Sequence, residues 1–514
     1  MSSAQLHNHK ASRKYSFMPR YDSIGPSGNT GSVTLFVLLM TMTLVMLFAA
    51  LVSYGTKQTR HAEMLRRLEL AGQSILHTYD RRLLEAYSLL AVDLDVAEPS
   101  AYLTGSFGPN LSWKQPDRTW TFEPSRRLDQ PVYFMEAVRQ AVAAGVAEEV
   151  LNGFVGRFAA VPELVENGKD SVEYNDPSAV FETHLSGSRE DGVENEDGEA
   201  GKDVNEALDV KPADRELAAK AIKWIRQAGK TEAVEGAQDP QNQGQTLDQD
   251  LDQDLDQDLD RTLSAAVKAN LTSRSYIGPK AALSSTDRGC FLFYVAHHFR
   301  HWVADRRAAF YTSTPQPSFF KAELEYILYG YDEEAFNKAR AFTEVYLMRL
   351  AGNAAHVSAC SEKQELIGVV AGAVQAIAGV PSQVTSSALV LTWGMAESRS
   401  DLKRLLSGEA LPWVHFTDET WRTRFGDGGN GAPDAPDAAM KHDDLTAADY
   451  GDHLIALLAA KASTNHVLRV MDLISIGDGK DGVDLGQRTT RFVISVETAD
   501  GLPGVIWEDG YGLD

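Results

Sequence analysis

The sequence predicts a mainly α-helical protein with a small β component, in which one N-terminal transmembrane helix continues into a long amphipathic helix and an α+β ectodomain. Three observations predict this fold class. Residues 33–52 form an uncharged apolar run, and apolar side chains recur every three or four residues over most of the second half of the chain. Residues 489–497, TTRFVISVE, alternate as a strand does, with Phe492, Ile494 and Val496 on one face.

The apolar run has the length of a transmembrane helix. A bilayer core of about 30 Å is crossed by about 20 helical residues, so residues 33–52 can span it once. A cleaved secretory signal is the alternative, but its apolar region is shorter and a small-x-small motif follows it. Here Ser53, Tyr54 and a charged helix follow. Basic residues flank the run on both sides, so the positive-inside rule does not orient it.

The helix continues beyond the anchor with one apolar face. Its stripe indicates a single rod of about 80 Å, at 1.5 Å per residue, if Gly55 and Gly72 do not break it. A helix half in lipid and half packed on a head is the design of type IV pilin-like subunits. The stripe consists of Met64, Leu68, Ala71, Ile75, Tyr79 and Leu83.

The stretch just before the anchor looks like a prepilin-type cleavage site. Such a site is cut after a glycine that adjoins the apolar segment, here Gly31, which would leave Ser32 as the mature N-terminus. True pilins carry a glutamate five residues after the cut, and Phe36 occupies that place here. The alternative is that Gly31 is an ordinary residue at the start of a helix.

The remaining chain divides by composition. Residues 212–230 indicate a helix with Pro212 in its first turn. Residues 185–211 are charged and lack aromatics, and LDQD repeats over 247–260, so disorder is expected around that helix. Calcium binding by the repeat is an alternative, although the glycine and ligand spacing of a calcium loop are missing. The expected organisation is a leader over 1–31, a transmembrane helix over 32–54, an amphipathic helix over 55–93, a first part of the ectodomain over 94–184, a largely disordered acidic insertion over 185–285 and a helical ectodomain core with a C-terminal strand over 286–514.

The core region predicts several helices. Residues 290–311 indicate one helix, 324–330 a short strand or buried turn, and 332–359 a second helix. Residues 365–380 are too short for a second span, and their glycines at 368, 372 and 379 could let helices approach closely. Further helices are expected over 386–408, over 447–462 after a capping-box-like Thr446 and Asp449, and over 468–474.

Three blocks of sequence resemble a known family. Residues 79–93, YDRRLLEAYSLLAVD, are similar to its YDxxLLxxYGLxxxD, with Ser88 in place of the glycine. Residues 320–330 resemble its ExEYILxG, and 468–474 resemble its RMxDLI. The family comprises uncharacterised bacterial membrane proteins that often accompany tight-adherence (Tad) pilus genes. The resemblance implies a single-pass protein of the cell membrane, with a cytoplasmic N-terminus, an extracytoplasmic ectodomain and pilus or secretion-system partners. It names no catalytic residues.

Composition excludes some functions. With 72 acidic and 49 basic residues, the formal charge of −23 argues against a nucleic-acid partner. The two cysteines, Cys290 and Cys360, cannot build a cysteine zinc site. They could pair in an oxidising compartment or could be two small buried side chains.

Two groups of residues are candidates for chemistry. His297 and His301 are four apart on the expected helix, as in zinc sites, and Asp305 continues their face, but the HExxH pattern is absent. Glu323 and Glu325 would share a face on a strand, with Arg340 or Arg349 opposite. Neither group assembles a catalytic set, so no cofactor is expected.

We therefore expect a non-enzymatic envelope protein, a minor pilin-like subunit or assembly factor of a Tad-type pilus or secretion system. One alternative is a membrane-tethered metal hydrolase that uses the histidine pair. Another is a pilus-independent adhesin or scaffold. The sequence does not define the oligomeric state.

Overall fold

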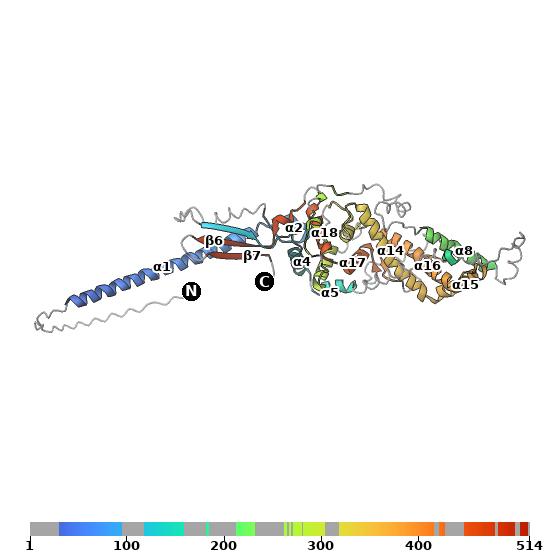
Figure 1. Ribbon diagram of the computed structural model, residues 1–514, viewed down its shortest axis with the longest axis horizontal. Coiled ribbons are helices and arrows are strands. Elements are labelled where there is room, and N and C mark those ends of the chain that lie inside the picture. Colours follow the sequence, from blue (N-terminus) through green and yellow to red (C-terminus); the bar gives the residue numbers. More distant parts are fainter. Residues whose placement is uncertain are drawn as a thin grey trace, which may run out of the picture.

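The chain forms an elongated molecule with a helical rod at one end and a lobe at the other (Figure 1). In this computed structural model the fold is mainly helical with a small β component, as the sequence predicts. The structure describes residues 30–94, 118–146, 148–158, 181–184, 212–231, 262–264, 267–268, 271–279, 281–303, 318–415, 421–426, 447–477, 482–498 and 504–511. The leader before residue 30 and the LDQD repeat lie outside these ranges.

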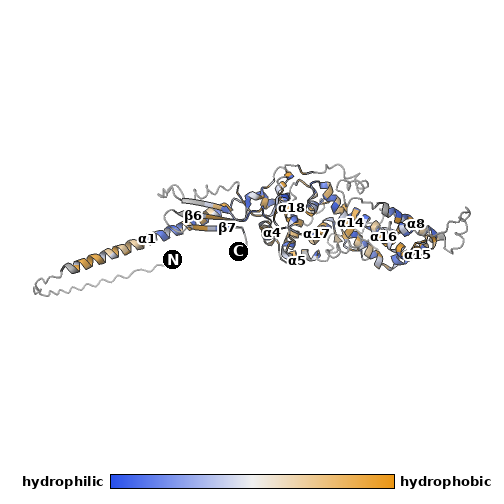
Figure 2. Cartoon of the chain, in the orientation of Figure 1, coloured by the Kyte–Doolittle hydropathy of each residue, from blue (hydrophilic) through white to orange (hydrophobic). Residues whose placement is uncertain are grey.

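Helix α1 (Thr30–Leu76) is the rod, about 70 Å long at 1.5 Å per residue. Its apolar part is exposed on all sides, and within the described ranges α1 is the one helix long and apolar enough to cross a membrane (Figure 2). Gly55 and Gly72 do not break it. The expectation of one unbroken amphipathic helix over 55–93 is wrong, because the helix ends at Leu76 and Asp80 then caps a separate helix, α2 (Arg81–Tyr87).

The second half of α1 packs on an antiparallel sheet of three strands. The strand order is β2 (Arg118–Pro124), β6 (Arg491–Thr498) and β7 (Val505–Gly510). The predicted strand at 489–497 is thus confirmed, and β2 lies in the expected first part of the ectodomain over 94–184. The packed residues are Met64, Leu68, Ala71 and Ile75 from α1, with Phe492, Ile494, Val496, Val505 and Trp507 from the sheet.

Gly72 sets how closely the helix approaches the sheet. A Cβ atom placed on Gly72 would lie 1.7 Å from the ring of Trp507. The indole of β7 therefore lies directly on the backbone of α1, which only glycine permits at this position. The C-terminal hairpin and the rod are joined at this contact.

The helical body follows the sheet along the molecule (Figure 1). One hydrophobic core joins its elements, which come from both halves of the chain. The helices predicted over 447–462 and 468–474 are present. Asp449 caps the first of them through a capping box with Asp452, and Thr446 lies outside the described residues. The main elements are α2, α4 (Pro131–Gly145), α5 (Glu148–Arg157), α11 (Thr272–Ser275), α12 (Ser285–His298), α13 (Glu323–Tyr329), α17 (Tyr450–Lys461) and α18 (Thr464–Ile476), with β1 (Val92–Asp93) paired to β5 (Arg488–Thr489), β3 (Leu411–Pro412) paired to β4 (Ala447–Ala448), and the short helix η2 (Leu485–Gln487).

Four long helices of the described residues build most of the distal lobe. These are α14 (Glu334–Ala359) and α16 (Ser382–Leu406), which run from the body into the lobe, with α15 (Ser361–Ala378) and α8 (Pro212–Thr231). The expectation of close helix approach at glycines 368 and 372 is wrong, because both face open space. The close approach occurs at Gly394 of α16, where a Cβ would lie 3.1 Å from the backbone of Ala354 in α14.

The two cysteines form no disulfide. Cys290 is buried in the body core on α12, whereas Cys360 lies at the junction of α14 and α15 in the distal lobe. The sequence leaves open a disulfide or two small buried side chains. The structure shows the second: Cys290 is buried and Cys360 is partly buried.

Candidate functional site: a buried polar cluster between body and distal lobe

The structure does not bring the predicted histidine pair together on one helix. Helix α12 ends at His298, so His301 lies beyond its end, and Asp305 lies outside the described residues. The ring of His297 stacks on Phe293 at a centroid distance of 6.2 Å, and burial lowers its pKa. His301 is buried beside Tyr450. The expected shared helical face of His297 and His301 is wrong, because the chain leaves the helix between the two residues.

The second predicted pair, Glu323 and Glu325, lies on a helix rather than on a strand. Both are buried at the start of α13, where Glu323 accepts the backbone N–H of Arg300 (2.9 Å) and Glu325 accepts that of Trp302 (3.0 Å). Burial, as the largest effect, raises the pKa of each carboxyl to about 7. The pair thus fixes the chain just after α12.

The arginines expected opposite this pair have other partners. The Arg340 guanidinium lies 3.4 Å from the Glu344 carboxylate, one turn further along α14. The guanidinium of Arg349 lies in the distal cluster described below. This expectation is therefore wrong, since the two arginines pair with Glu344 and Asp401 instead of the two glutamates.

Two of the family-like blocks meet in space. Arg469 of α18 donates to the carbonyl oxygen of Ile327 (2.9 Å) at the end of α13. A Cβ atom placed on Gly330 would lie only 2.4 Å from Arg469 Nε, and Gly330 has a φ of 70°. The Tyr326 hydroxyl donates to Asp472 (3.3 Å). The blocks at 320–330 and 468–474 therefore hold α13 against α18, which is a structural role.

The first block joins the rod to the body. Asp80 accepts the backbone N–H groups of Arg82 and Leu83 at the start of α2, and its other oxygen lies 2.7 Å from Arg488 Nε. Ser88, where the resembling motif has glycine, ends α2 with a φ of 56°. Glycine is the residue favoured at such a left-handed helix end. The glycine of the resembling motif is therefore explained by backbone conformation.

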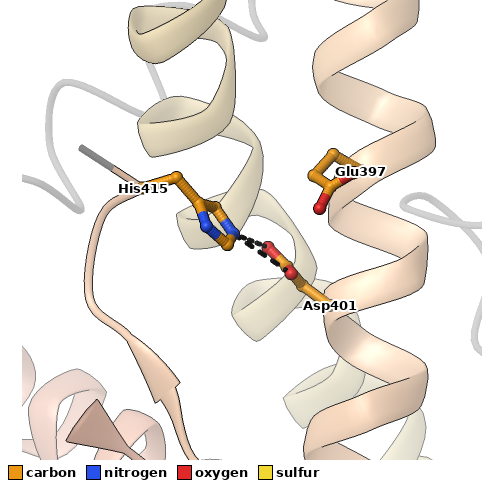
Figure 3. Close-up of side chains that lie close together, drawn as sticks. All are labelled: Glu397, Asp401 and His415. Atoms are coloured by element: carbon orange, nitrogen blue, oxygen red, sulfur yellow. Dashed lines mark hydrogen bonds and ion pairs between the residues drawn. The ribbon is translucent and has the colours of Figure 1, made fainter. Parts of the chain in front are cut away.

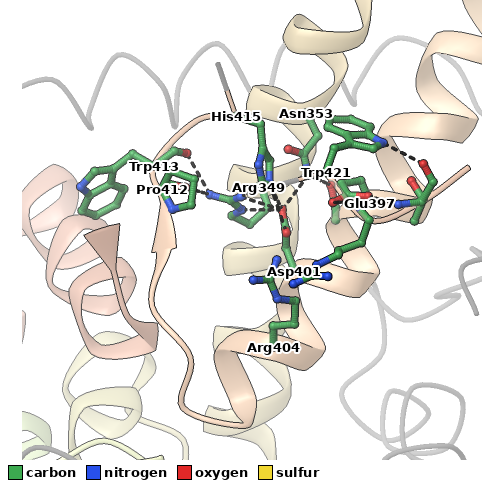
Figure 4. Close-up of polar contacts among 12 residues, drawn as sticks. Arg349, Asn353, Glu397, Asp401, Arg404, Pro412, Trp413, His415 and Trp421 are labelled. Atoms are coloured by element: carbon green, nitrogen blue, oxygen red, sulfur yellow. Dashed lines mark hydrogen bonds and ion pairs between the residues drawn. The ribbon is translucent and has the colours of Figure 1, made fainter. Parts of the chain in front are cut away.

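The most concentrated buried charge lies between the body and the distal lobe. Figure 3 shows Glu397 and Asp401 on α16 and His415 on the segment after β3. Arg349 and Asn353 of α14 complete the cluster (Figure 4). All five side chains are buried. Three separate chain segments therefore contribute to one polar centre.

Asp401 is at the centre of this cluster. It accepts hydrogen bonds from Arg349 Nε (2.9 Å), Arg349 Nη2 (2.6 Å) and Asn353 Nδ2 (3.0 Å), and His415 Nε2 lies 3.1 Å away. Burial alone would raise the pKa of Asp401. The positive charge of Arg349 and the hydrogen bonds from His415 and Asn353 outweigh burial, so the pKa lies well below its usual range.

Arg349 joins the helices to the segment that follows β3. Its Nη1 donates to the carbonyl oxygens of Pro412 (2.6 Å) and Trp413 (2.9 Å), while its Nη2 lies 2.9 Å from His415 Nε2. The guanidinium donates through two nitrogens to one oxygen of the Asp401 carboxylate and through the third to two carbonyl oxygens, so its charge is paired and all three nitrogens donate.

Glu397 anchors a second segment of chain to the distal lobe. Its two carboxylate oxygens accept the backbone N–H groups of Arg422 (2.9 Å) and Thr423 (2.8 Å). Burial, with a smaller effect from the charge of Asp401, raises the pKa of Glu397. Nearby, the indole of Trp421 lies 5.6 Å from the His415 ring. The cluster thus positions both stretches that flank residues 416–420.

The donor set does not fit a metal ion. One ligand atom from each of Glu397, Asp401 and His415 lies within 4.8 Å of the others, which is a spacing that a metal could bridge. The Arg349 guanidinium already supplies the cation at this point, and Glu397 is bound to two backbone amides. The arrangement is a closed, buried ion-pair network that can hold three segments in register.

Sequence reasoning missed this cluster, although a signal for it exists. Leu389, Trp393, Glu397, Asp401 and Leu405 follow one another at steps of four along α16, so two acidic residues interrupt an apolar stripe. Val345, Arg349 and Asn353 repeat the pattern on α14. Charged side chains at core positions of a helix predict buried ion pairs, but not their partners.

Fold and site together define a class: mainly helical proteins carried by one N-terminal helix, long and apolar enough to span a membrane, with a buried ion-pair centre in the head. The chain belongs to DUF5702, a family of unknown function, whose profile matches residues 219–496. No curated protein and no solved structure matches the chain. The matched range begins in α8 and ends in β6, so it includes the distal lobe and the buried cluster.

Proposed function

We propose that this protein is a non-enzymatic, pilin-like subunit or assembly factor of a Tad-type pilus or secretion system, anchored in the cell membrane with its head outside the cytoplasm. The observation that carries the proposal is the rod. A single helix exposes an uncharged apolar half and buries the other half on an antiparallel sheet. A helix shared in this way between lipid and head is the design of pilin-like subunits.

The connectivity of the sheet supports the same proposal. Its strands come from the two ends of the described chain, β2 shortly after the rod and β6 with β7 at the C-terminus. Apart from α2 and β1, the helical body and the distal lobe are inserted between β2 and β6. The rod and the sheet form the part that a pilin-like subunit would share with other subunits of the assembly. The inserted helices form a large head that can bind a partner.

The polar centres support a role in holding the head together rather than in catalysis. In the buried cluster Asp401, Arg349 and Glu397 bind one another or backbone groups. The hydrolase alternative depended on His297 and His301 sharing a helical face, which α12 does not provide. A binding or assembly function needs a rigid head, and such networks specify one arrangement of packed helices.

The test is the N-terminus of the mature protein. Membrane fractions from cells with and without the prepilin peptidase are compared by mass spectrometry. We expect a peptidase-dependent start at Ser32, and Gly31→Leu should abolish this cleavage because a bulky side chain replaces the glycine at the cut. Gly55→Ala is the matched control, since it alters a glycine of the same helix away from the cut and should be processed normally.

The outcome separates the proposal from a static scaffold. An intact leader in both strains would overturn the processed pilin-like subunit and would favour a pilus-independent tethered adhesin. Stoichiometric zinc in the purified full chain would favour the metal-hydrolase alternative, because the buried cluster has the Arg349 guanidinium, not a metal ion, beside Asp401 and His415.

A further inference from the structure

Residues 421–426, WRTRFG, lie against the distal lobe without forming a helix or a strand. Thr423 is buried, whereas Trp421 and Phe425 are half-buried and pack against the lobe core. The buried side chains of that core come from other parts of the chain. The segment therefore lies on the outside of a lobe that has its own hydrophobic core.

Trp421 contacts three helices of the lobe. Its ring lies 5.0 Å from the ring of His356 on α14 and 6.4 Å from the ring of Trp393 on α16, measured between centroids. The ammonium group of Lys363 on α15 lies 4.4 Å from the centroid of the Trp421 ring, which is a cation–π distance. The first aromatic side chain of the segment is thus bound from three sides.

Phe425, four residues later, contacts the fourth helix. Its ring centroid lies 5.1 Å from that of Trp224 on α8 and 5.6 Å from that of Trp393, in both cases edge to face. The two aromatic side chains of the segment therefore both pack on Trp393, and together they contact all four long helices of the lobe.

Between the two rings the lobe binds the backbone of the segment. The carboxylate of Glu397 accepts the N–H groups of Arg422 (2.9 Å) and Thr423 (2.8 Å), and the Trp393 indole N–H donates to the carbonyl oxygen of Thr423 (3.4 Å). In peptide recognition, main-chain hydrogen bonds supply affinity and side-chain contacts supply specificity. The lobe thus binds its own segment with the two kinds of contact that bind a peptide ligand.

The surface beneath the segment requires an occupant. Glu397 is buried, and a buried carboxylate that loses its hydrogen-bond donors is strongly unfavourable. Removal of the segment would also expose the apolar rings of Trp224 and Trp393 to water. A replacement must therefore supply two successive backbone N–H groups between two aromatic side chains.

The outer side of the segment is accessible. Arg424 is exposed, and a Cβ atom placed on Gly426 would meet no described atom within 4 Å. The distal lobe also lies at the end of the molecule opposite the rod (Figure 1). A partner can therefore reach the segment from solvent.

We infer that the distal lobe carries a peptide-binding surface that residues 421–426 cover, and that its ligand is a linear segment of a partner protein with two aromatic side chains four residues apart. The inference goes beyond the proposed function, and it does not depend on cleavage at Gly31. We call this site the peptide surface, and it consists of Trp224, His356, Lys363, Trp393 and Glu397.

The chain's own segment acts as an internal competitor. A tethered ligand has an effective concentration in the millimolar range when its tether is short. In a second copy of the chain the same segment is held by its own lobe in the same way, so it is not free to bind elsewhere. A different protein is therefore the partner that fits the peptide surface.

The experiment measures binding of a fluorescein-labelled, end-capped peptide with the sequence of residues 421–426 to the full chain in detergent, by fluorescence anisotropy. Trp421→Ala with Phe425→Ala removes both rings of the internal competitor. This double variant should bind the peptide at least about tenfold more tightly than the wild type does. Circular dichroism checks that the variant keeps its helix content, and Phe425→Ala alone takes its place if it does not.

Two altered peptides test the contacts with the double variant. A peptide with Thr423→Pro keeps both aromatic residues but lacks one N–H that Glu397 accepts, so it should bind at least about tenfold more weakly. A peptide with Arg424→Ala is the matched control and should bind like the unaltered peptide, because Arg424 is exposed.

Three results would overturn the inference. These are equal binding of the peptide by the wild type and a folded variant, absence of binding by a folded variant, and equal binding of the Thr423→Pro peptide. Native mass spectrometry of the double variant mixed with the wild type tests the second copy as the source of the ligand. A mixed dimer would overturn the assignment of the peptide surface to a different protein.

Discussion

Replacing Glu325 by glutamine should stabilise the protein at alkaline pH. Glu325 is fully buried on α13, accepts the backbone N–H of Trp302 (3.0 Å) and faces the hydroxyl of Tyr450. Burial raises its pKa to about 7, and the nearby charge of Glu334 adds to this effect. Glutamine has the same shape and keeps an oxygen for the Trp302 N–H, so the substitution removes mainly the buried charge.

The size and sign of the change in the free energy of unfolding follow from the difference in the proton affinity of Glu325 between the folded and unfolded states. The pKa of Glu325 rises from its ordinary 4.5 to about 7 on folding, which corresponds to about 3 kcal/mol. Because the folded pKa is the higher one, the folded state binds the proton more tightly, and the carboxyl costs stability as the pH rises from about 4.5 to above 7. The advantage of Glu325→Gln should therefore be small near pH 4.5 and reach about 3 kcal/mol near pH 8.

The assay is urea unfolding of the full chain in detergent, followed by tryptophan fluorescence at about pH 5 and about pH 8. Glu365→Gln on the exposed surface of α15 is the matched control, and its effect should stay within about 0.5 kcal/mol at both pH values. A free-energy difference between wild type and Glu325→Gln that is the same at both pH values would refute the assignment of a buried, charged carboxylate.

Three further substitutions test the packing contacts. Gly72→Ala should lower the free energy of unfolding by about 1–3 kcal/mol, because the new methyl group would overlap the ring of Trp507, and urea unfolding measures this. Asp401→Asn should cost about 3–5 kcal/mol, since it leaves Arg349 as a buried charge without its carboxylate, and a thermal shift should show it. Ser88→Gly should raise stability by about 1 kcal/mol by relieving the φ of 56°, as measured by the urea midpoint.

The first two of these have a control. Gly368→Ala places a methyl group in open space on α15 and should stabilise slightly, so equal losses at glycines 368 and 72 would show that the Trp507 contact is not the cause. Replacing both Arg349 and Asp401 by leucine or methionine should cost less than Asp401→Asn alone, because no unpaired charge remains. A larger loss in the double variant would contradict the proposed cause.

Local patterns in the sequence determined the rod and most of the helices. The uncharged run and the stripe at Met64, Leu68, Ala71 and Ile75 are properties of consecutive residues, and the structure buries that stripe as predicted. The alternation at Phe492 determined β6 in the same way. Periodicity identifies which face of an element is buried, because each side chain's direction depends only on the local backbone.

Element ends were less well determined, because contacts outside the element decide them. The sequence pattern continues through His298 to His301, but α12 ends at His298, and carboxylates of Glu323 and Glu325 bind the backbone that follows. Those carboxylates come from a later helix. The residues next to 298 in the sequence therefore do not show where the helix ends.

Only the tertiary structure decided which distant residues meet. The sequence places Arg349 and Asp401 at core positions of two helices, yet it does not say that they pair, or that Arg469 lies against Gly330. Such pairings depend on how helices pack across loops of any length, whereas helix formation depends on neighbours within one or two turns. The sequence thus determined the elements and their buried faces, and packing decided the partners of the buried charges.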